Sequence, residues 1–167
     1  MLFEGTRLAI IAGKGGVGKT TVACALALAH ARRGHRVLLA EAQGGGSAAR
    51  MLGVPYGGAK IREVEPNLFL VDMDPQEAIH EYALLILRFE SVYRAVFENR
   101  LVRHFVRLVP ALSELVMLGK IWFHETESAH ERPRFDRIVL DAPATGHAIS
   151  MLRAPSVVMG TVPAGAM

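Results

Sequence analysis

The most restrictive feature of the sequence is the glycine-rich run GKGGVGKT at residues 13–20. It follows the apolar segment 7–13, which has the composition of a buried strand, and it opens the alanine-rich segment 18–34, which is typical of a helix. This order fits the pattern G-x-x-x-x-G-K-[ST], in which backbone N–H groups surround phosphate oxygens at a helix N-terminus. The run therefore predicts a phosphate-binding loop between a strand and a helix.

The rest of the chain alternates between strand and helix patterns. Short apolar runs at 35–41, 67–75 and 135–143 predict three further strands, and helical periodicity dominates residues 76–130. Such alternation predicts an α/β fold, a P-loop NTPase whose mostly parallel sheet is flanked by helices, with the helical subregion 76–130 inserted before the last strand. The glycine-rich segment 42–60 is expected to be mobile.

Length and composition limit the domain organisation. A chain of 167 residues with 51% apolar side chains supports one core, so we expect a single P-loop domain over residues 1–167. Four parallel strands make a small sheet for a nucleotide-binding fold, which suggests that this domain continues beyond Met167.

Charge and cysteine content exclude several classes of protein. The net charge of +3 is too weak to indicate a nucleic-acid partner, and no apolar run reaches the roughly 18 residues of a membrane span, which argues against integral membrane insertion. Cys24 is the single cysteine, so neither an internal disulfide nor a multi-thiol metal site can form within the chain. No signal-peptide pattern is visible either, so we expect a cytoplasmic protein. Cys24 lies among alanines in the predicted helix, and we expect it to be a small buried thiol.

The loop motif predicts roles for individual side chains in binding a nucleoside triphosphate and Mg²⁺, and the family resemblance given below implies that the nucleotide is ATP. Lys19 is expected to reach the β- and γ-phosphates, while the Thr20 hydroxyl ligates Mg²⁺. Asp141 ends an apolar strand, where a carboxylate can hold Mg²⁺ through water. The expected nucleotide-binding residues of the loop are Gly13, Lys14, Gly15, Gly16, Val17, Gly18, Lys19, Thr20 and Thr21.

A second lysine, Lys14, separates this loop from an ordinary phosphate loop. KGGVGKT resembles the deviant Walker A motif of the ATPase class that includes MinD, ParA, the nitrogenase iron protein and the arsenite pump ATPase. The resemblance implies a homodimer in which Lys14 reaches across the nucleotide interface to the partner's nucleotide. A cation there would stabilise charge during phosphoryl transfer. The alternative is a solvated loop lysine.

The stretch DAPATGH at residues 141–147 narrows the resemblance. It is similar to the D-T-A-P-T-G-H switch II motif of the arsenite pump ATPase and tail-anchored protein targeting ATPase family, with Asp141, Pro143, Thr145, Gly146 and His147 matching. The resemblance implies a dimeric switch that binds and hydrolyses Mg-ATP, in which Gly146 and Thr145 sense the γ-phosphate through backbone contacts. It covers nearly the whole chain as the N-terminal part of a family member, so adenine-binding segments and any interface zinc site would lie beyond Met167.

Switch I departs from the family pattern. The resemblance implies an aspartate after the second strand, but this sequence has Glu41 and, two residues later, Gln43. Three readings remain open: Gln43 orients the attacking water and hydrolysis is slow, Glu41 supplies a carboxylate to water or outer-shell Mg²⁺, or the protein binds nucleotide with little turnover. We expect a slow ATPase.

The substrate is constrained mainly by chemistry. Arsenite would need several converging thiolates, which Cys24 alone cannot provide, so we expect an unidentified protein partner or client. Apolar residues of 78–123 could line a groove for a client helix, or simply form core and dimer packing. A ParA/MinD-like spatial-organisation ATPase and a nucleotide-binding regulator are the alternatives, and the Thr-Gly-His ending speaks against the first. Asp74 and Pro75 are expected to begin a helix as its N-cap and first residue.

Overall fold

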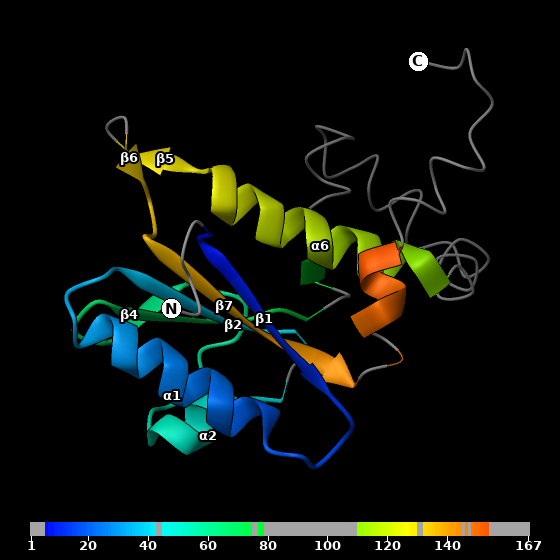
Figure 1. Ribbon diagram of the computed structural model, residues 1–167, viewed down its shortest axis with the longest axis horizontal. Coiled ribbons are helices and arrows are strands. Elements are labelled where there is room, and N and C mark those ends of the chain that lie inside the picture. Colours follow the sequence, from blue (N-terminus) through cyan, green and yellow to red (C-terminus); the bar gives the residue numbers. More distant parts are fainter. Residues whose placement is uncertain are drawn as a thin grey trace, which may run out of the picture.

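A computed structural model describes residues 6–42, 45–74, 77–78, 110–129, 132–144, 146 and 148–153. The labels used below are those of Figure 1. In chain order, the elements are β1 (Leu8–Gly13), α1 (Lys19–Ala31), β2 (Val37–Glu41), α2 (Ser47–Leu52), β3 (Arg62–Glu65), β4 (Leu68–Asp72), α6 (Pro110–Thr126), β5 (Ser128–Ala129), β6 (Arg132–Pro133) and β7 (Arg137–Ala144).

The described strands form a mostly parallel sheet, which confirms the predicted α/β P-loop fold. The strand order is β1-β7-β2-β4-β3, and all neighbours pair in parallel except β3 and β4. The four predicted strands are present, and β3 adds an antiparallel edge strand that the sequence did not predict. Its residues are charged except for Val64, since an edge strand at the rim of the core needs little apolar surface.

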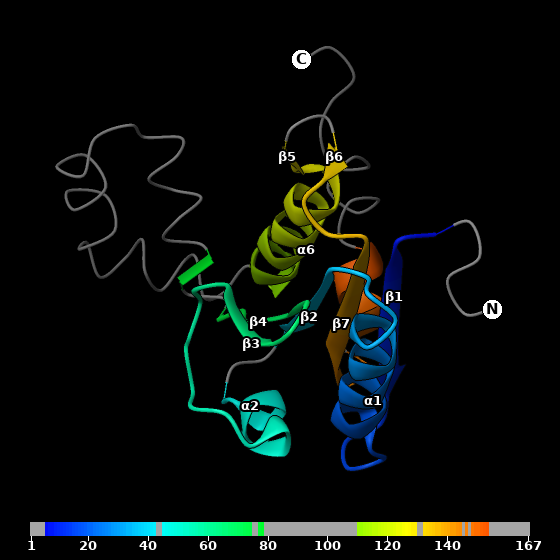
Figure 2. The ribbon, with the colours of Figure 1, turned by 90° about the vertical axis from the view of Figure 1, so that its left-hand side faces the viewer.

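Helices cover both faces of this sheet. Figures 1 and 2 show α1 and α2 on one face and α6 on the other. The arrangement follows from the order of the strands. The connection through α1 runs from β1 past β7 to β2, whereas the connection that includes α6 runs in the opposite direction, from β4 past β2 to β7. Right-handed crossovers that run in opposite directions put their helices on opposite faces.

The helix after the loop packs closely on the sheet through small side chains. Ala23, Ala27 and Ala31 recur every four residues along α1 and are buried against Leu39, Val139 and other apolar residues of the strands. Small residues at this spacing let the helix axis approach the sheet. The helix was predicted to extend to Gly34, but it ends at Ala31, and Gly34 closes the following turn with φ of 86°.

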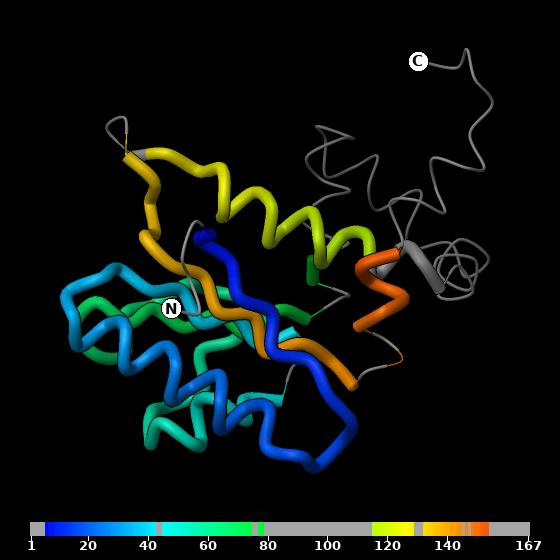
Figure 3. Tube along the Cα trace, in the orientation of Figure 1, coloured from blue at the N-terminus to red at the C-terminus, as the bar shows by residue number. Residues whose placement is uncertain are grey.

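The opposite face holds the larger apolar side chains. Met117 and Ile121 of α6 pack with Phe135, Leu38 and Leu140 in the second part of the core. After α6 the chain makes the short antiparallel pair β5–β6 before it returns to the sheet as β7, a path that Figure 3 traces from yellow to orange. The predicted helical subregion 76–130 therefore also contains strand β5, and its residues 79–109 lie outside the described part of the chain.

Two segments between strands differ from simple loops. Within the segment 42–60, which was expected to be mobile, residues 47–52 instead form α2, whose Ala48 and Ala49 are buried in the core. At the end of β4, Oδ1 of Asp74 accepts a hydrogen bond of 3.1 Å from the backbone N–H of Glu77, as an N-cap does. Of the helices that the structure describes, none has the length and apolarity to cross a bilayer.

Candidate nucleotide site

The phosphate loop leaves the carboxyl end of β1 and returns as the first turn of α1. Gly16 and Gly18 have φ of 78° and 89°, a backbone region that side chains with Cβ rarely occupy. The first turn of α1 contains no acidic residue, and no side chain caps it. Its backbone N–H groups, with the helix dipole behind them, are therefore available to an anion.

The two lysines of the loop lie in different surroundings. Nζ of Lys19 donates a hydrogen bond of 3.3 Å to the carbonyl oxygen of Lys14, so the amine is folded back over the loop. Lys14 itself is exposed, as are Gly15, Gly16 and Val17. An exposed Lys14 is compatible with a solvated lysine and with one that reaches a partner subunit, so its role stays a prediction.

The two residues predicted to hold Mg²⁺ are brought together. β7 lies beside β1, with Asp141 in register with Ile11, and the Thr20 hydroxyl donates a 2.6 Å hydrogen bond to Oδ2 of Asp141. The other carboxylate oxygen, Oδ1, is buried and has no hydrogen-bond partner among the described residues. Burial raises the pKa of Asp141, while the Thr20 hydrogen bond and the Lys19 charge oppose this shift.

This donor set fits Mg²⁺. The ion prefers hard oxygen ligands, and it usually keeps several waters while it binds one or two protein groups and substrate phosphates. Among the described residues, no three His, Cys, Asp or Glu side chains converge in the manner of a protein-only metal cage. Asp141 does not end its strand as predicted, because β7 continues to Ala144 and Ala144 pairs with Gly13.

Three buried carboxylates form a row across the carboxyl half of the sheet. Glu41 of β2 is in register with Asp141 of β7 on one side and with Asp72 of β4 on the other. Their exposed fractions are 5%, 6% and 4% respectively. Because residues in register point to the same face of a sheet, all three side chains lie on the face that α1 and α2 cover.

The carboxylates of Glu41 and Asp72 contact the backbone at the start of α2. Oε1 of Glu41 accepts from the N–H of Ser47 at 2.9 Å, and Oε2 accepts from the N–H of Ala48 at 3.0 Å. Oδ2 of Asp72 accepts from the N–H of Gly46 at 3.0 Å. The catalytic role considered for Glu41 stays a prediction, and its two oxygens cap α2 in this structure.

Neither this capping nor the alignment of the three carboxylates was predicted from the sequence. A signal for the alignment was available, because Glu41, Asp72 and Asp141 each follow an apolar run within a predicted strand. Parallel strands that begin together bring such positions into one row.

The remaining predicted residues are only partly described. Gln43, Thr145 and His147 lie outside the described residues. Gly146 is exposed, and its carbonyl oxygen accepts a hydrogen bond of 3.1 Å from Oγ of Ser150 in the following helical segment. Thr21 is exposed on the first turn of α1. The contacts predicted for Gly146 and Thr21 with phosphate remain predictions.

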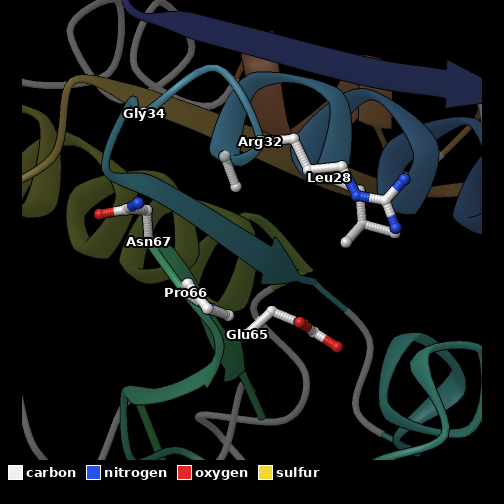
Figure 4. Close-up of a pocket in the computed structure, with 7 residues that line it drawn as sticks. Leu28, Arg32, Gly34, Glu65, Pro66 and Asn67 are labelled. Atoms are coloured by element: carbon white, nitrogen blue, oxygen red, sulfur yellow. The ribbon is translucent and has the colours of Figure 1, made fainter.

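A separate pocket of about 300 Å³ lies at the other end of the sheet, between the end of α1 and the turn from β3 to β4 (Figure 4). Ligands of open α/β sheets bind outside the carboxyl ends of the strands, and this pocket lies at the amino ends of β2 and β4. We therefore assign it no part in the candidate site. Its lining residues are Leu28, Ala31, Arg32, Gly34, Glu65, Pro66 and Asn67.

Comparison with known proteins agrees with these features. A family model described as anion-transporting ATPase matches residues 6–163. ATPase BagA of Mycobacterium tuberculosis is 34% identical over 151 residues, which are 86% of this chain and 44% of that protein. The arsenical pump-driving ATPases of Acidiphilium multivorum and Escherichia coli are 32% and 30% identical, and each match covers 86% of this chain and 24% of the relative.

The chain spans less than half the length of these relatives. Within that span, the family match includes the loop, Thr20 and Asp141. The chain belongs to the anion-transporting ATPase family.

Proposed function

We propose that this chain is the phosphate-binding part of a dimeric switch ATPase that binds and hydrolyses Mg-ATP. The observation that carries the proposal is the hydrogen bond between Thr20 and Asp141 beside an uncapped helix N-terminus. In such an enzyme the phosphate and Mg²⁺ sites must lie side by side. Thr20, Asp141 and the N-terminus of α1 lie together at the carboxyl end of β1. The domain would cover residues 1–167 and continue in a further C-terminal part.

Each residue of the site has a defined task in this proposal. The loop N–H groups and Lys19 bind the phosphates, Thr20 ligates Mg²⁺, and Asp141 holds it through water. When bound, Mg²⁺ neutralises charge on the β- and γ-phosphate oxygens. Lys14 is exposed at the loop, from which it would reach the nucleotide of the partner subunit and make hydrolysis depend on dimer closure.

Hydrolysis is proposed to be slow because of Gln43. An amide can orient a water molecule, but it cannot accept a proton as a carboxylate does. Replacing Gln43 with Asp should therefore raise kcat. If kcat is unchanged by Gln43→Asp and abolished by Glu41→Gln, the role passes to Glu41.

A protein partner or client in the cytoplasm is proposed in place of arsenite. Two relatives are named arsenical pump-driving ATPases, but a metalloid site needs several thiolates. Cys24 lies on the buried face of α1, where it is 2% exposed, and it is the single cysteine of the sequence. Burial, with the negative charges of Asp141 and Glu41, raises its pKa to about 11, so it is a poor thiolate.

A nucleotide-binding regulator with little hydrolysis is the second candidate. It is favoured by one observation, the glutamine at position 43 where the resemblance implies aspartate. Steady-state turnover distinguishes the two candidates, because a regulator would bind Mg-ATP tightly without measurable release of phosphate.

The test compares Lys14→Ala and Lys19→Ala with the wild type. Lys19→Ala should lose ATP binding, whereas Lys14→Ala should bind ATP but fail to hydrolyse it, with dimer formation followed by light scattering. Arg132→Ala removes the same charge from an exposed position on β6 and serves as the control. A monomer that hydrolyses ATP equally well with and without Lys14 would contradict the dimeric mechanism.

A further inference from the structure

Burying the neighbouring carboxylates of Glu41 and Asp72 is unfavourable for the stability of the folded protein. They are neighbours in register on β2 and β4, and both are buried. Two carboxylates this close repel each other and lose their hydration, so each needs strong compensating hydrogen bonds. Three backbone N–H groups, those of Gly46, Ser47 and Ala48, donate to both oxygens of Glu41 and to Oδ2 of Asp72, whereas Oδ1 of Asp72 is buried without a hydrogen-bond partner among the described residues.

These three donors are consecutive residues of one segment. The segment begins with Gly46, whose φ is 63°, and continues into the first turn of α2. The ring of Tyr56 closes over Gly46, where an added Cβ would meet its Cδ2 atom at 2.6 Å. The segment is therefore held by two carboxylates on the sheet side and by an aromatic ring on another side.

The end of β2, which precedes this segment in the chain, is tied to the predicted Mg²⁺ residue and to β4. The N–H of Ala42 donates to the carbonyl oxygen of Asp141 at 3.0 Å, and the N–H of Met73 donates to the carbonyl oxygen of Glu41 at 2.8 Å. The end of β2 is thus fixed on both sides. The carboxylates of Glu41 and Asp72 then join the start of α2 to β2 and β4.

We propose that Glu41 and Asp72 are positioning residues that anchor Gly46–Ala48 next to the Mg-ATP site, and that Glu41 is not a proton acceptor in hydrolysis. The inference rests on the proposed function and deepens it. Both oxygens of Glu41 already accept backbone hydrogen bonds, as a carboxylate with an anchoring role would. The chain between β2 and α2 contains position 43 of switch I, and the anchor holds the α2 end of this connection. We therefore expect turnover to depend on the anchor.

The variants separate the loss of a hydrogen-bond acceptor from the loss of the negative charge. Asn at position 72 can still accept the Gly46 N–H through its amide oxygen, whereas Ala cannot. Gln at position 41 keeps one of the two acceptors, and Ala keeps neither. Glu65→Ala removes an exposed carboxylate at the end of β3 and is the matched control.

Hydrogen exchange measures the anchor without nucleotide. The amide of Gly46 in Asp72→Ala, and the amides of Ser47 and Ala48 in Glu41→Ala, should exchange about tenfold faster or more, as expected for the loss of a charge-assisted hydrogen bond. Asp72→Asn should exchange close to the wild type. Equal exchange in all the variants and the wild type would overturn the anchor.

Steady-state kinetics measures the consequence for turnover. The Ala variants should lose about tenfold in kcat with a KM for ATP near that of the wild type, Asp72→Asn should recover most of kcat, and Glu41→Gln should be more active than Glu41→Ala. If Glu41→Gln is as inactive as Glu41→Ala while its amides exchange slowly, Glu41 acts as a carboxylate in the reaction and the inference is wrong. If the wild type does not turn over ATP, the proposed function fails, and the exchange data still decide whether the anchor exists.

Discussion

The hydroxyl of Thr20 donates a 2.6 Å hydrogen bond to Oδ2 of Asp141, joining residues 121 positions apart in the sequence. The contact forms because β7 enters the sheet directly beside β1, so that its carboxylate faces the first turn of α1. A hydroxyl and a carboxylate held in this way, next to open backbone N–H groups, form the core of the proposed Mg-ATP site.

Replacing Thr20 with Val should weaken the binding of Mg-ATP. Valine has the shape of threonine without the hydroxyl, so the proposed Mg²⁺ ligand is lost and Oδ2 of Asp141 loses its donor. We expect the affinity for ATP in the presence of Mg²⁺ to fall about tenfold, with a smaller change without Mg²⁺. Calorimetric titration checks this, and Thr20→Ser, which keeps the hydroxyl, should bind almost like the wild type.

Asp141→Asn should stabilise the nucleotide-free protein while it removes Mg²⁺-dependent binding. Burial raises the pKa of Asp141, which means that the folded state disfavours its charge. Asparagine removes the charge, and its amide oxygen can still accept the Thr20 hydroxyl. Thermal unfolding should show a higher Tm without nucleotide and little further increase on addition of Mg-ATP. A lower Tm without nucleotide would mean that the buried charge is well compensated.

Stability should fall on mild acidification because of His124. This α6 side chain is 7% exposed, and Nε2 has no hydrogen-bond partner among the described residues. Burial lowers its pKa, against the opposing effect of Glu127, so the unfolded chain binds the proton more readily than the folded protein. The free energy of unfolding is therefore retained above the unfolded pKa of about 6.5 and decreases as the pH falls below it.

Urea unfolding at neutral and mildly acidic pH, with the wild type and His124→Gln, measures this effect. The variant should lose less stability on acidification than the wild type. His35→Gln changes a partly exposed histidine and is the control. An identical pH dependence for the wild type and His124→Gln would contradict the assignment.

Gly46→Ala and Gly119→Ala should have opposite effects on stability. At Gly46 the φ of 63° disfavours a side chain by roughly 1–2 kcal/mol, and Cβ would also press on the Tyr56 ring. Gly119 lies inside α6, where an added Cβ meets nothing within 4 Å, so alanine should stabilise the helix by about 1 kcal/mol. Denaturant titration compares the two, and combining Gly46→Ala with Tyr56→Ala should recover only the part of the loss that is due to the ring.

Cys24 should be unreactive in the folded protein. Its pKa of about 11 leaves almost no thiolate at pH 8, and its side chain is buried. Modification by iodoacetamide, followed by mass spectrometry, should be slow without denaturant and rapid in urea. Rapid modification of the folded protein would show that the packing around α1 is looser than described.

The predictable parts of the fold are those that the sequence encodes locally. The loop at 13–20, the helix after it and the four parallel strands each have a continuous signature of their own. The strand order could not be predicted, since the insertion of β7 between β1 and β2 depends on pairing between distant segments. The edge strand β3 and the six-residue α2 are too short for periodicity to reveal.

The site was predictable to a similar extent. Lys19, Thr20 and Asp141 follow from motifs, and the structure brings Thr20 and Asp141 into contact. The sequence showed Glu41 as a departure from the family pattern, but its hydrogen-bond partners could not be predicted. They are backbone N–H groups of α2, a helix that the sequence did not predict. The predicted strand at 135–143 already passes Asp141, and the structure differs by one residue at this end because pairing with β1 continues to Ala144.

The most direct measurement is calorimetric titration of the purified protein with ATP, in the presence and absence of Mg²⁺, for the wild type and Lys19→Ala. We predict saturable binding to the wild type that is tighter with Mg²⁺ and is weakened about tenfold or more by Lys19→Ala, because a charge-assisted contact with phosphate is lost. Failure of the wild type to bind ATP, or equal binding by Lys19→Ala, would contradict the proposal that residues 13–20 hold a nucleotide.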